Sequence, residues 1–124
     1  MVVKEKKKGV KKMKLTHLLA DFSGCKRSEI EKVSSIRSIL KEAVQSSDLK
    51  EVGQVFHQFK NPLGVTGLIL LTSSHIALHT WPEKGYVALD IFSCDKKKKV
   101  FKAFEVIRSE LKPTKIRVDC LDRG

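Results

Sequence analysis

A histidine and a cysteine are the residues whose types and positions best suit chemistry. His79 begins the segment His-Thr-Trp-Pro-Glu, and Cys94 ends a run of alternating apolar residues. On neighbouring strands, such a pair could act as nucleophile and base or as proton donor and acceptor, or both could be core residues without a reactive role. Cysteine is among the residue types most often buried, so periodicity alone favours the structural interpretation.

The sequence lacks the spacing of a metal or nucleotide site. In an extended strand, His75 and His79 would stand about 13 Å apart, which is too far for one ion. The three cysteines, Cys25, Cys94 and Cys120, have no CxxC spacing, so we expect reduced thiols rather than a zinc ribbon or a disulfide framework. Neither a P-loop motif nor a GxGxxG motif occurs, so we predict no metal site and no separate cofactor site.

Two helices are predicted from apolar residues that recur three and four positions apart. The first runs from Ser28 to about Ser47 and begins with a capping box of Ser28 and Glu31. The second covers residues 100–111, and its first turn follows a block of lysines that the helix dipole disfavours.

Alternating or continuous apolar runs predict the strands that these helices cover. The predicted strands are 15–23, Val52–Phe59, Val65–Leu71, Ile76–Trp81, Tyr86–Cys94 and Lys115–Cys120, the last suited to a sheet edge. This order predicts an α+β fold, a two-layer sandwich in which helices cover one face of a mainly antiparallel sheet.

The two strands around residues 82–85 divide into an aliphatic side and a polar and aromatic side. The aliphatic side, expected to face the helices, holds Ile76, Leu78, Val87, Leu89 and Ile91. The other side holds His79, Trp81, Asp90 and Cys94. The two helices cannot cover this second side, so we expect a second subunit and a ligand to cover it.

The formal charge of +11 is concentrated at one end of the chain. Residues 1–14 hold seven lysines and one glutamate, so we expect a disordered basic tail followed by a single domain over residues 15–124. The tail can attract nucleic-acid phosphates non-specifically, but we do not expect a nucleic acid as the main partner. The longest apolar run, Leu68–Leu71, is far too short for a membrane span, and no signal peptide is recognised, so a cytoplasmic location is expected.

The segment Gly64–Cys94 resembles the core of the bacterial and archaeal S-adenosylmethionine decarboxylases, pyruvoyl enzymes of polyamine synthesis. It reads GVTGLILLTSSHIALHTWPEKGYVALDIFSC. The family pattern has a Gly-Val-Ser-Gly strand, a Glu-Ser-His cleavage site, Ile-His-Thr-Trp-Pro-Glu, a Gly-Tyr strand and Phe-Thr-Cys. The resemblance continues in residues 17–25, 56–59 and 102–105, so it covers nearly all of the chain after the tail.

The resemblance implies a proenzyme that cleaves itself between Ser73 and Ser74. Ser74 resembles the serine that attacks the preceding carbonyl. β-Elimination then breaks the resulting ester, and Ser74 becomes a pyruvoyl group at the new N-terminus. This group forms a Schiff base with the α-amine of the substrate and takes up the electrons released as CO2 leaves. The cofactor is therefore made from the chain itself.

The same resemblance implies roles for two residues in cleavage and for one in decarboxylation. His79 and Thr66, where the family usually has serine, resemble the pair that assists cleavage, with His79 removing the α-proton of the serine. Cys94 resembles the acid that protonates the product. Thiols ordinarily have a pKa of about 8.5, so they are largely protonated at neutral pH and can donate a proton.

Four further residues resemble the substrate site of the family. Phe59 and Trp81 resemble the aromatic residues that stack on adenine. Glu83 resembles the acceptor for the ribose hydroxyls, and the backbone of Ile76 is expected to read the edge of adenine.

The predicted hairpin leaves a gap between the cleavage site and its catalytic histidine. If residues 72–75 form a tight turn, Thr66 and His79 lie opposite each other. Ser74 is then five positions from His79, too far to touch along a straight strand. A bulge, a wider loop or a contribution from a second subunit must close the gap.

Ser73 and Asp95 also depart from the family pattern, as Thr66 does. Ser73 stands where the family nearly always has glutamate, and Asp95 replaces the glycine that commonly follows the cysteine. The attacked carbonyl belongs to the backbone, so cleavage remains chemically possible, but we predict slower or incomplete processing.

The predicted function is that of a self-processing, pyruvoyl-dependent S-adenosylmethionine decarboxylase that acts as a homodimer of processed protomers. It would form decarboxylated S-adenosylmethionine and CO2 for spermidine synthesis. Three alternatives remain: an arginine decarboxylase of the same family type, a noncatalytic paralogue that is never cleaved, and a basic RNA-binding α/β module. The adenine and ribose residues disfavour the first, Ser73 motivates the second, and the lack of an aromatic-rich strand disfavours the third.

Overall fold

The computed structural model describes residues 13–124, in which six strands and three α-helices follow one another. The strands are β1 (Leu15–Ser23), β2 (Glu51–Lys60), β3 (Leu63–Leu71), β4 (Ser74–Trp81), β5 (Tyr86–Ser93) and β6 (Lys115–Arg123). The helices are α1 (Arg27–Ile30), α2 (Val33–Ser47) and α3 (Lys97–Leu111), and a short 3-10 helix, η1 (Pro82–Lys84), joins β4 to β5. Residues 1–12, most of the predicted basic tail, lie outside the described residues.

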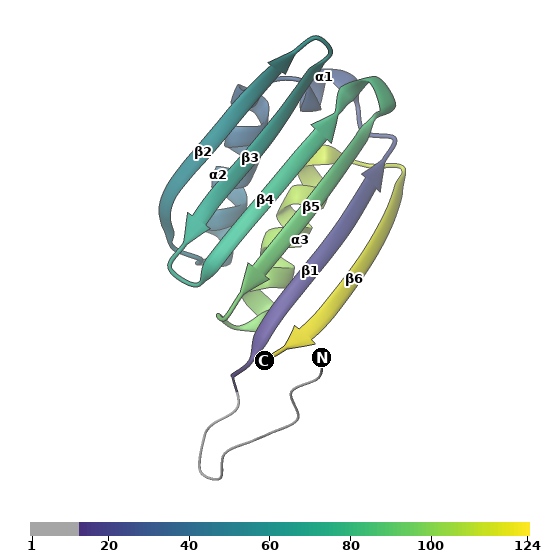
Figure 1. The fold of residues 1–124 in the computed structure, drawn as a ribbon. Coiled ribbons are helices and arrows are strands. Elements are labelled where there is room, and N and C mark those ends of the chain that lie inside the picture. Colours follow the sequence, from purple (N-terminus) through teal and green to yellow (C-terminus); the bar gives the residue numbers. More distant parts are fainter. Residues whose placement is uncertain (1–12) are drawn as a thin grey trace, which may run out of the picture.

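The strands form a single antiparallel sheet, with the helices on one of its faces (Figure 1). The order across the sheet is β2-β3-β4-β5-β1-β6, so β6 is an edge strand, as predicted. This arrangement confirms the predicted α+β sandwich. Across residues 13–124, no helix is both long enough and apolar enough to cross a membrane.

The hydrophobic core lies between the sheet and the helices. The predicted aliphatic side of β4 and β5 faces this core, and each of its five residues is at most 2% exposed. From the other layer, α2 contributes Ile36 and Leu40, and α3 contributes Phe104, whose ring stacks on Phe22 of β1 at 6.0 Å. All the helices of residues 13–124 lie on this side of the sheet, so the described chain leaves the other face without helices. That face is called here the open face (Figure 1).

The predicted single helix from Ser28 to Ser47 is wrong, because the structure divides it into α1 and α2. Lys32 has an extended backbone, with φ −124° and ψ 144°. The side-chain amide of Gln58, on β2, bridges the break: its oxygen accepts the N–H of Val33 at 2.9 Å, and its nitrogen donates to the carbonyl of Glu31 at 2.8 Å. A side chain from the sheet thus satisfies the backbone groups that the break exposes.

The predicted capping box of Ser28 and Glu31 is also wrong. Lys26 and Lys32 are the N-cap residues of α1 and α2, and neither makes a side-chain cap hydrogen bond among the described residues. Ser28 lies inside α1, so its hydroxyl is past the position from which a serine caps a helix.

A tight turn of Thr72 and Ser73 joins β3 to β4, as the hairpin prediction requires. The pairing is regular from Thr66 opposite His79 to Leu71 opposite Ser74. Ser74 itself has a φ of +127°, a conformation that is strained for a residue with a side chain. The backbone strain therefore lies at the predicted cleavage site.

Candidate active site

Apart from Ile76, the predicted site residues fall into two groups at opposite ends of the sheet. One group, called the His79 end, comprises Phe59, Thr66, His79, Trp81 and Glu83. The other, the Ser74 end, comprises Ser73, Ser74 and Cys94. In Figure 1, the turn between β3 and β4, directly before Ser74, is at the lower end of the sheet, and the connection from β4 to β5, which contains η1, is at the upper end.

Thr66 and His79 are in direct contact at the His79 end. The Oγ1 of Thr66 lies 3.0 Å from the Nδ1 of His79, because the two residues are paired across β3 and β4. The predicted pairing is therefore confirmed. The contact fixes the orientation of the imidazole. In the tautomer whose Nδ1–H donates to the hydroxyl of Thr66, Nε2 is unprotonated and can accept a proton.

All five residues of the His79 end line one cleft of about 350 Å³. Phe59 and Trp81 are 48% and 40% exposed, so both rings present apolar surface to the cleft. Glu83, on η1, adds an exposed carboxylate. Aromatic faces beside a hydrogen-bond acceptor suit a ligand that joins a planar ring to hydroxyl groups.

Tyr86 supports the wall of this cleft, a role that the sequence analysis did not assign. Its ring lies 5.3 Å from that of Trp81, and its hydroxyl donates to a carboxylate oxygen of Asp21 at 2.6 Å. The hydrogen bond to Asp21, followed by burial, raises the pKa of Tyr86. The phenol therefore stays neutral and is anchored beside Trp81.

At the Ser74 end, the backbone presents the bond that would be cleaved. The carbonyl oxygen of Ser73 accepts a hydrogen bond from the N–H of Cys94 at 3.0 Å. This is the carbonyl that Ser74 would attack, and a backbone N–H at that oxygen stabilises the negative charge that develops during attack. Donor and scissile bond are fixed by the neighbouring ends of β4 and β5.

The thiol of Cys94 is exposed and lines a second cleft of about 630 Å³. The cleft contains cationic side chains, Lys96 and Arg123 among them, and the carboxylates of Asp95 and Asp122. Cys25, by contrast, is buried, and burial raises its pKa. Of these two thiols, only that of Cys94 can reach a ligand on the open face.

The structure does not bring Ser74 and His79 together within one chain. Five positions along β4 correspond to about 16 Å, and neither cleft contains both residues. The ladder between them is regular, so the structure excludes both a bulge and a wider loop as the means of closing the gap.

A polar cluster occupies the open face between the two ends. Asp90 contacts His17 Nε2 at 2.5 Å through one carboxylate oxygen and His75 Nε2 at 3.3 Å through the other. Arg123 approaches His17 at 3.2 Å and lies over the ring of Phe92 at 4.9 Å. The cluster fixes His75, the residue that directly follows Ser74.

Ile76 is the one predicted site residue that reaches neither end. It is 0% exposed and is paired with Ile69 on one side and Ile91 on the other. Its role in reading adenine stays a prediction. Within residues 13–124, no group of three or more His, Cys, Asp or Glu residues could hold a metal ion.

Comparisons with known proteins agree on one family. The sequence model described as S-adenosylmethionine decarboxylase matches residues 16–124. The S-adenosylmethionine decarboxylase proenzyme of Archaeoglobus fulgidus is 46% identical over 108 residues, which cover 87% of this chain and 96% of that protein. The proenzyme of the same description from Sulfurihydrogenibium sp. is 45% identical over 108 residues, 87% of this chain and 80% of that protein.

A solved structure shares the fold. The crystal structure of the adenosylmethionine decarboxylase from Aquifex aeolicus matches with a TM-score of 0.87 and 36% sequence identity, over 92% of this chain and 93% of that one. This chain is therefore similar to the Aquifex aeolicus protein in both sequence and fold over nearly its whole length.

Proposed function

Since the chain belongs to the S-adenosylmethionine decarboxylase family, we propose that it cleaves itself between Ser73 and Ser74 and then decarboxylates S-adenosylmethionine. Members of this family are proenzymes that depend on a pyruvoyl group, and their product serves polyamine biosynthesis. The observation that carries the proposal for this chain is the scissile turn, where a strained Ser74 follows a carbonyl that is bonded to the N–H of Cys94.

Cleavage begins with attack of the Ser74 hydroxyl on the carbonyl carbon of Ser73. The C–N bond breaks as the C–O bond forms, and the strain at Ser74, with φ +127°, favours a step that frees its nitrogen. A base then removes the α-proton of Ser74, and the Cβ–O bond breaks to release the carboxylate of Ser73. The amine at residue 74 is finally lost as ammonia through hydrolysis, which leaves a carbonyl at the new N-terminus.

We assign the base to His79 of the partner subunit. Stacked sheets lie about 10 Å apart. A twofold axis between two open faces, crossing β4 near Ala77, reverses the strand direction. Ser74 lies three positions before Ala77, and His79 lies two positions after Ala77. The axis therefore places Ser74 of one chain opposite the partner's His79. A homodimer through the open face would close the gap that the regular ladder leaves.

The exposed apolar residues of the open face support this homodimer. Leu19, Val55, Leu70 and Leu121 project from β1, β2, β3 and β6 and are 38%, 63%, 46% and 49% exposed. Burying them against a second copy would remove this apolar surface from water. The same contact would join the Ser74 end of one protomer to the His79 end of the other, which gives two complete sites per dimer.

The residues around Ser74 fit a pyruvoyl group, because the new N-terminus would start β4 beside the exposed thiol of Cys94, with His75 held by Asp90. That group supplies a carbonyl that takes the substrate's amine and accepts the electron pair released with CO2. Cys94 holds the proton that the product then needs. Phe59 and Trp81 of the partner subunit would hold adenine, and Glu83 of the partner subunit would accept the ribose hydroxyls.

Neither the three alternatives nor a nucleic-acid partner is favoured by the site. The aromatic cleft and Glu83 suit a nucleoside better than the aliphatic stem of arginine. We also propose a cytoplasmic location, where the three free cysteines would stay reduced.

Release of labelled CO2 tests the substrate assignment. Purified protein is incubated with carboxyl-labelled S-adenosylmethionine or carboxyl-labelled arginine, with Ser74→Ala as the control that cannot form the pyruvoyl group. We expect CO2 from S-adenosylmethionine only, and none from the control. CO2 from arginine alone, or none from fully cleaved protein, would contradict the assignment.

A further inference from the structure

A buried serine, Ser93, touches both the scissile turn and the backbone that follows β5. Its Oγ donates to the Oγ of Ser73 at 3.0 Å and accepts the N–H of Asp95 at 3.0 Å. Ser93 is 0% exposed and Ser73 is 7% exposed. A hydroxyl has one proton and two acceptor sites, so Ser93 can accept the N–H of Asp95 and donate to Ser73 at the same time.

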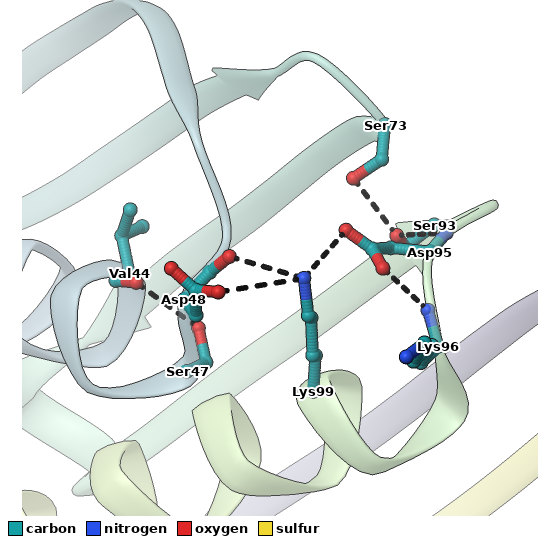
Figure 2. A network of polar contacts seen from close by, with 8 residues as sticks. All are labelled: Val44, Ser47, Asp48, Ser73, Ser93, Asp95, Lys96 and Lys99. Carbon is teal, nitrogen blue, oxygen red and sulfur yellow. Dashed lines mark hydrogen bonds and ion pairs between the residues drawn. The ribbon is translucent and has the colours of Figure 1, made fainter.

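The segment after Ser93 is itself anchored to both long helices (Figure 2). Asp95 accepts the N–H of Lys96 at 2.7 Å and the ammonium of Lys99 at 3.3 Å. Lys99 also reaches Asp48, directly after α2, with its ammonium 3.3 Å from the backbone carbonyl. Ser93 therefore links the turn to a fixed part of the protein.

We propose that Ser93 is a positioning residue for self-cleavage, which holds the Ser73 side chain so that the Ser73 carbonyl stays against the N–H of Cys94. Two contacts from consecutive residues of one segment then fix Ser73, one on its side chain and one on its carbonyl. The inference rests on the proposed function and adds the residue that lets a serine, rather than the usual glutamate, precede Ser74.

The contact has a direct consequence for the cleavage step. Attack requires the hydroxyl of Ser74 and the carbonyl of Ser73 to keep one relative orientation, and small displacements of reacting groups slow such reactions strongly. Without the Ser93 contact, the two-residue turn can move away from Cys94, and the developing oxyanion loses its donor for part of the time.

The test compares cleavage rates of single and double variants by mass spectrometry of freshly made protein. Ser93→Ala should cleave about tenfold more slowly, and Ser93→Thr, which keeps the hydroxyl, should cleave within about threefold of the wild-type rate. Ser73→Ala should be slowed like Ser93→Ala. If the two serines act through each other, the double variant should be no slower than the slower single one.

Ser47→Ala is the matched control for lost stability. Ser47 is also a buried serine, 4% exposed, but its hydroxyl donates within α2, to the carbonyl of Val44 at 3.1 Å (Figure 2), and has no other hydrogen bond to residues 13–124. The Ser47→Ala variant should lower the midpoint of thermal unfolding without slowing cleavage. If Ser93→Ala cleaves at the wild-type rate, or if the effects of Ser73→Ala and Ser93→Ala multiply, the inference is overturned while the proposed function stands. A wild-type chain that never cleaves would overturn both.

Discussion

In the proposed function, Cys94 serves the site through two different parts of the same residue. Its backbone N–H donates to the carbonyl of Ser73, while its thiol is exposed in the cleft at the Ser74 end. A side-chain substitution leaves the N–H in place. A side-chain variant can therefore test the role of the thiol without removing the hydrogen bond from the backbone N–H.

Cys94→Ala should cleave itself at close to the wild-type rate and then be a poor decarboxylase. Loss of a positioned proton donor typically lowers turnover by about 10²-fold or more. Mass spectrometry gives the extent of cleavage, and CO2 release gives kcat and KM. A variant that remains intact would show that the thiol is needed for processing, and an unchanged kcat would remove Cys94 from the proton transfer.

The sequence predicts some of the contacts at the candidate site and misses others. Thr66 and His79 pair as expected because hairpin register follows from the length of the turn. Two contributions had no local signal: the hydrogen bond from Ser93 to Ser73 spans 20 residues, and the bond from Tyr86 to Asp21 spans 65. Such contacts depend on which strands are neighbours in the folded sheet, and the strand order of the sheet cannot be predicted from local sequence patterns.

At the scale of elements, strands were more predictable than helix ends. Period-two patterns identify the buried face of β4 and β5 because one side of each strand must leave water. The break between α1 and α2 could not be read in the same way, since Gln58, which satisfies it, lies 25 residues after Val33. A cap by Ser28 was the best local guess, and tertiary contact overrode it.

Gln58→Ala should destabilise the protein more than Gln54→Ala, a matched change on the same strand. The side chain of Gln58 bonds the backbone at Val33 and Glu31. Gln54 is exposed, and within the described part of the chain its side chain bonds the side chains of Arg37 and Glu51 alone. Leaving partly buried backbone groups without partners costs about 1–3 kcal/mol. Urea unfolding measures both variants. Equal losses would mean that the amide of Gln58 does not hold the helix break.

Asp95 should make the start of α3 sensitive to acid. The backbone N–H of Lys96, and then the ammonium of Lys99, hold the pKa of Asp95 below its ordinary value. A carboxylate of this kind stabilises the folded state above its unfolded pKa of about 3.9, and the contribution is lost as the pH falls through the lower folded value. The stability gap between wild type and Asp95→Asn should therefore be larger at pH 7 than at pH 3. Urea unfolding at both values checks this, and an equal gap would contradict the account.

At the scale of the whole molecule, the proposed site residues lie at two separate places on one domain. The Ser74 end and the His79 end lie about 16 Å apart on a single strand, with the cluster of His17, Asp90 and His75 between them. In the part of the chain that the structure describes, the helices lie on one face of the sheet (Figure 1). A second copy stacked on the other face would therefore complete the site and cover the apolar surface at once.

Two variants that are each inactive should restore cleavage when they are combined. Ser74→Ala keeps His79, and His79→Ala keeps Ser74. In a mixed dimer one complete site forms, from Ser74 of one chain and His79 of the other. With equal amounts and random pairing, about half of the His79→Ala chains should be cleaved, and the Ser74→Ala chains should all stay intact. Co-expression with tags of different mass distinguishes the chains. Intact His79→Ala chains in the mixture would contradict a site shared between subunits.

The intact mass of the purified protein tests the central claim most directly. The account predicts two chains, residues 1–73 with a free carboxyl end and residues 74–124 with a pyruvoyl group in place of Ser74, and it predicts that Ser74→Ala remains a single chain of 14.0 kDa. A wild-type chain that still has the full mass of 14.0 kDa after prolonged incubation would contradict it.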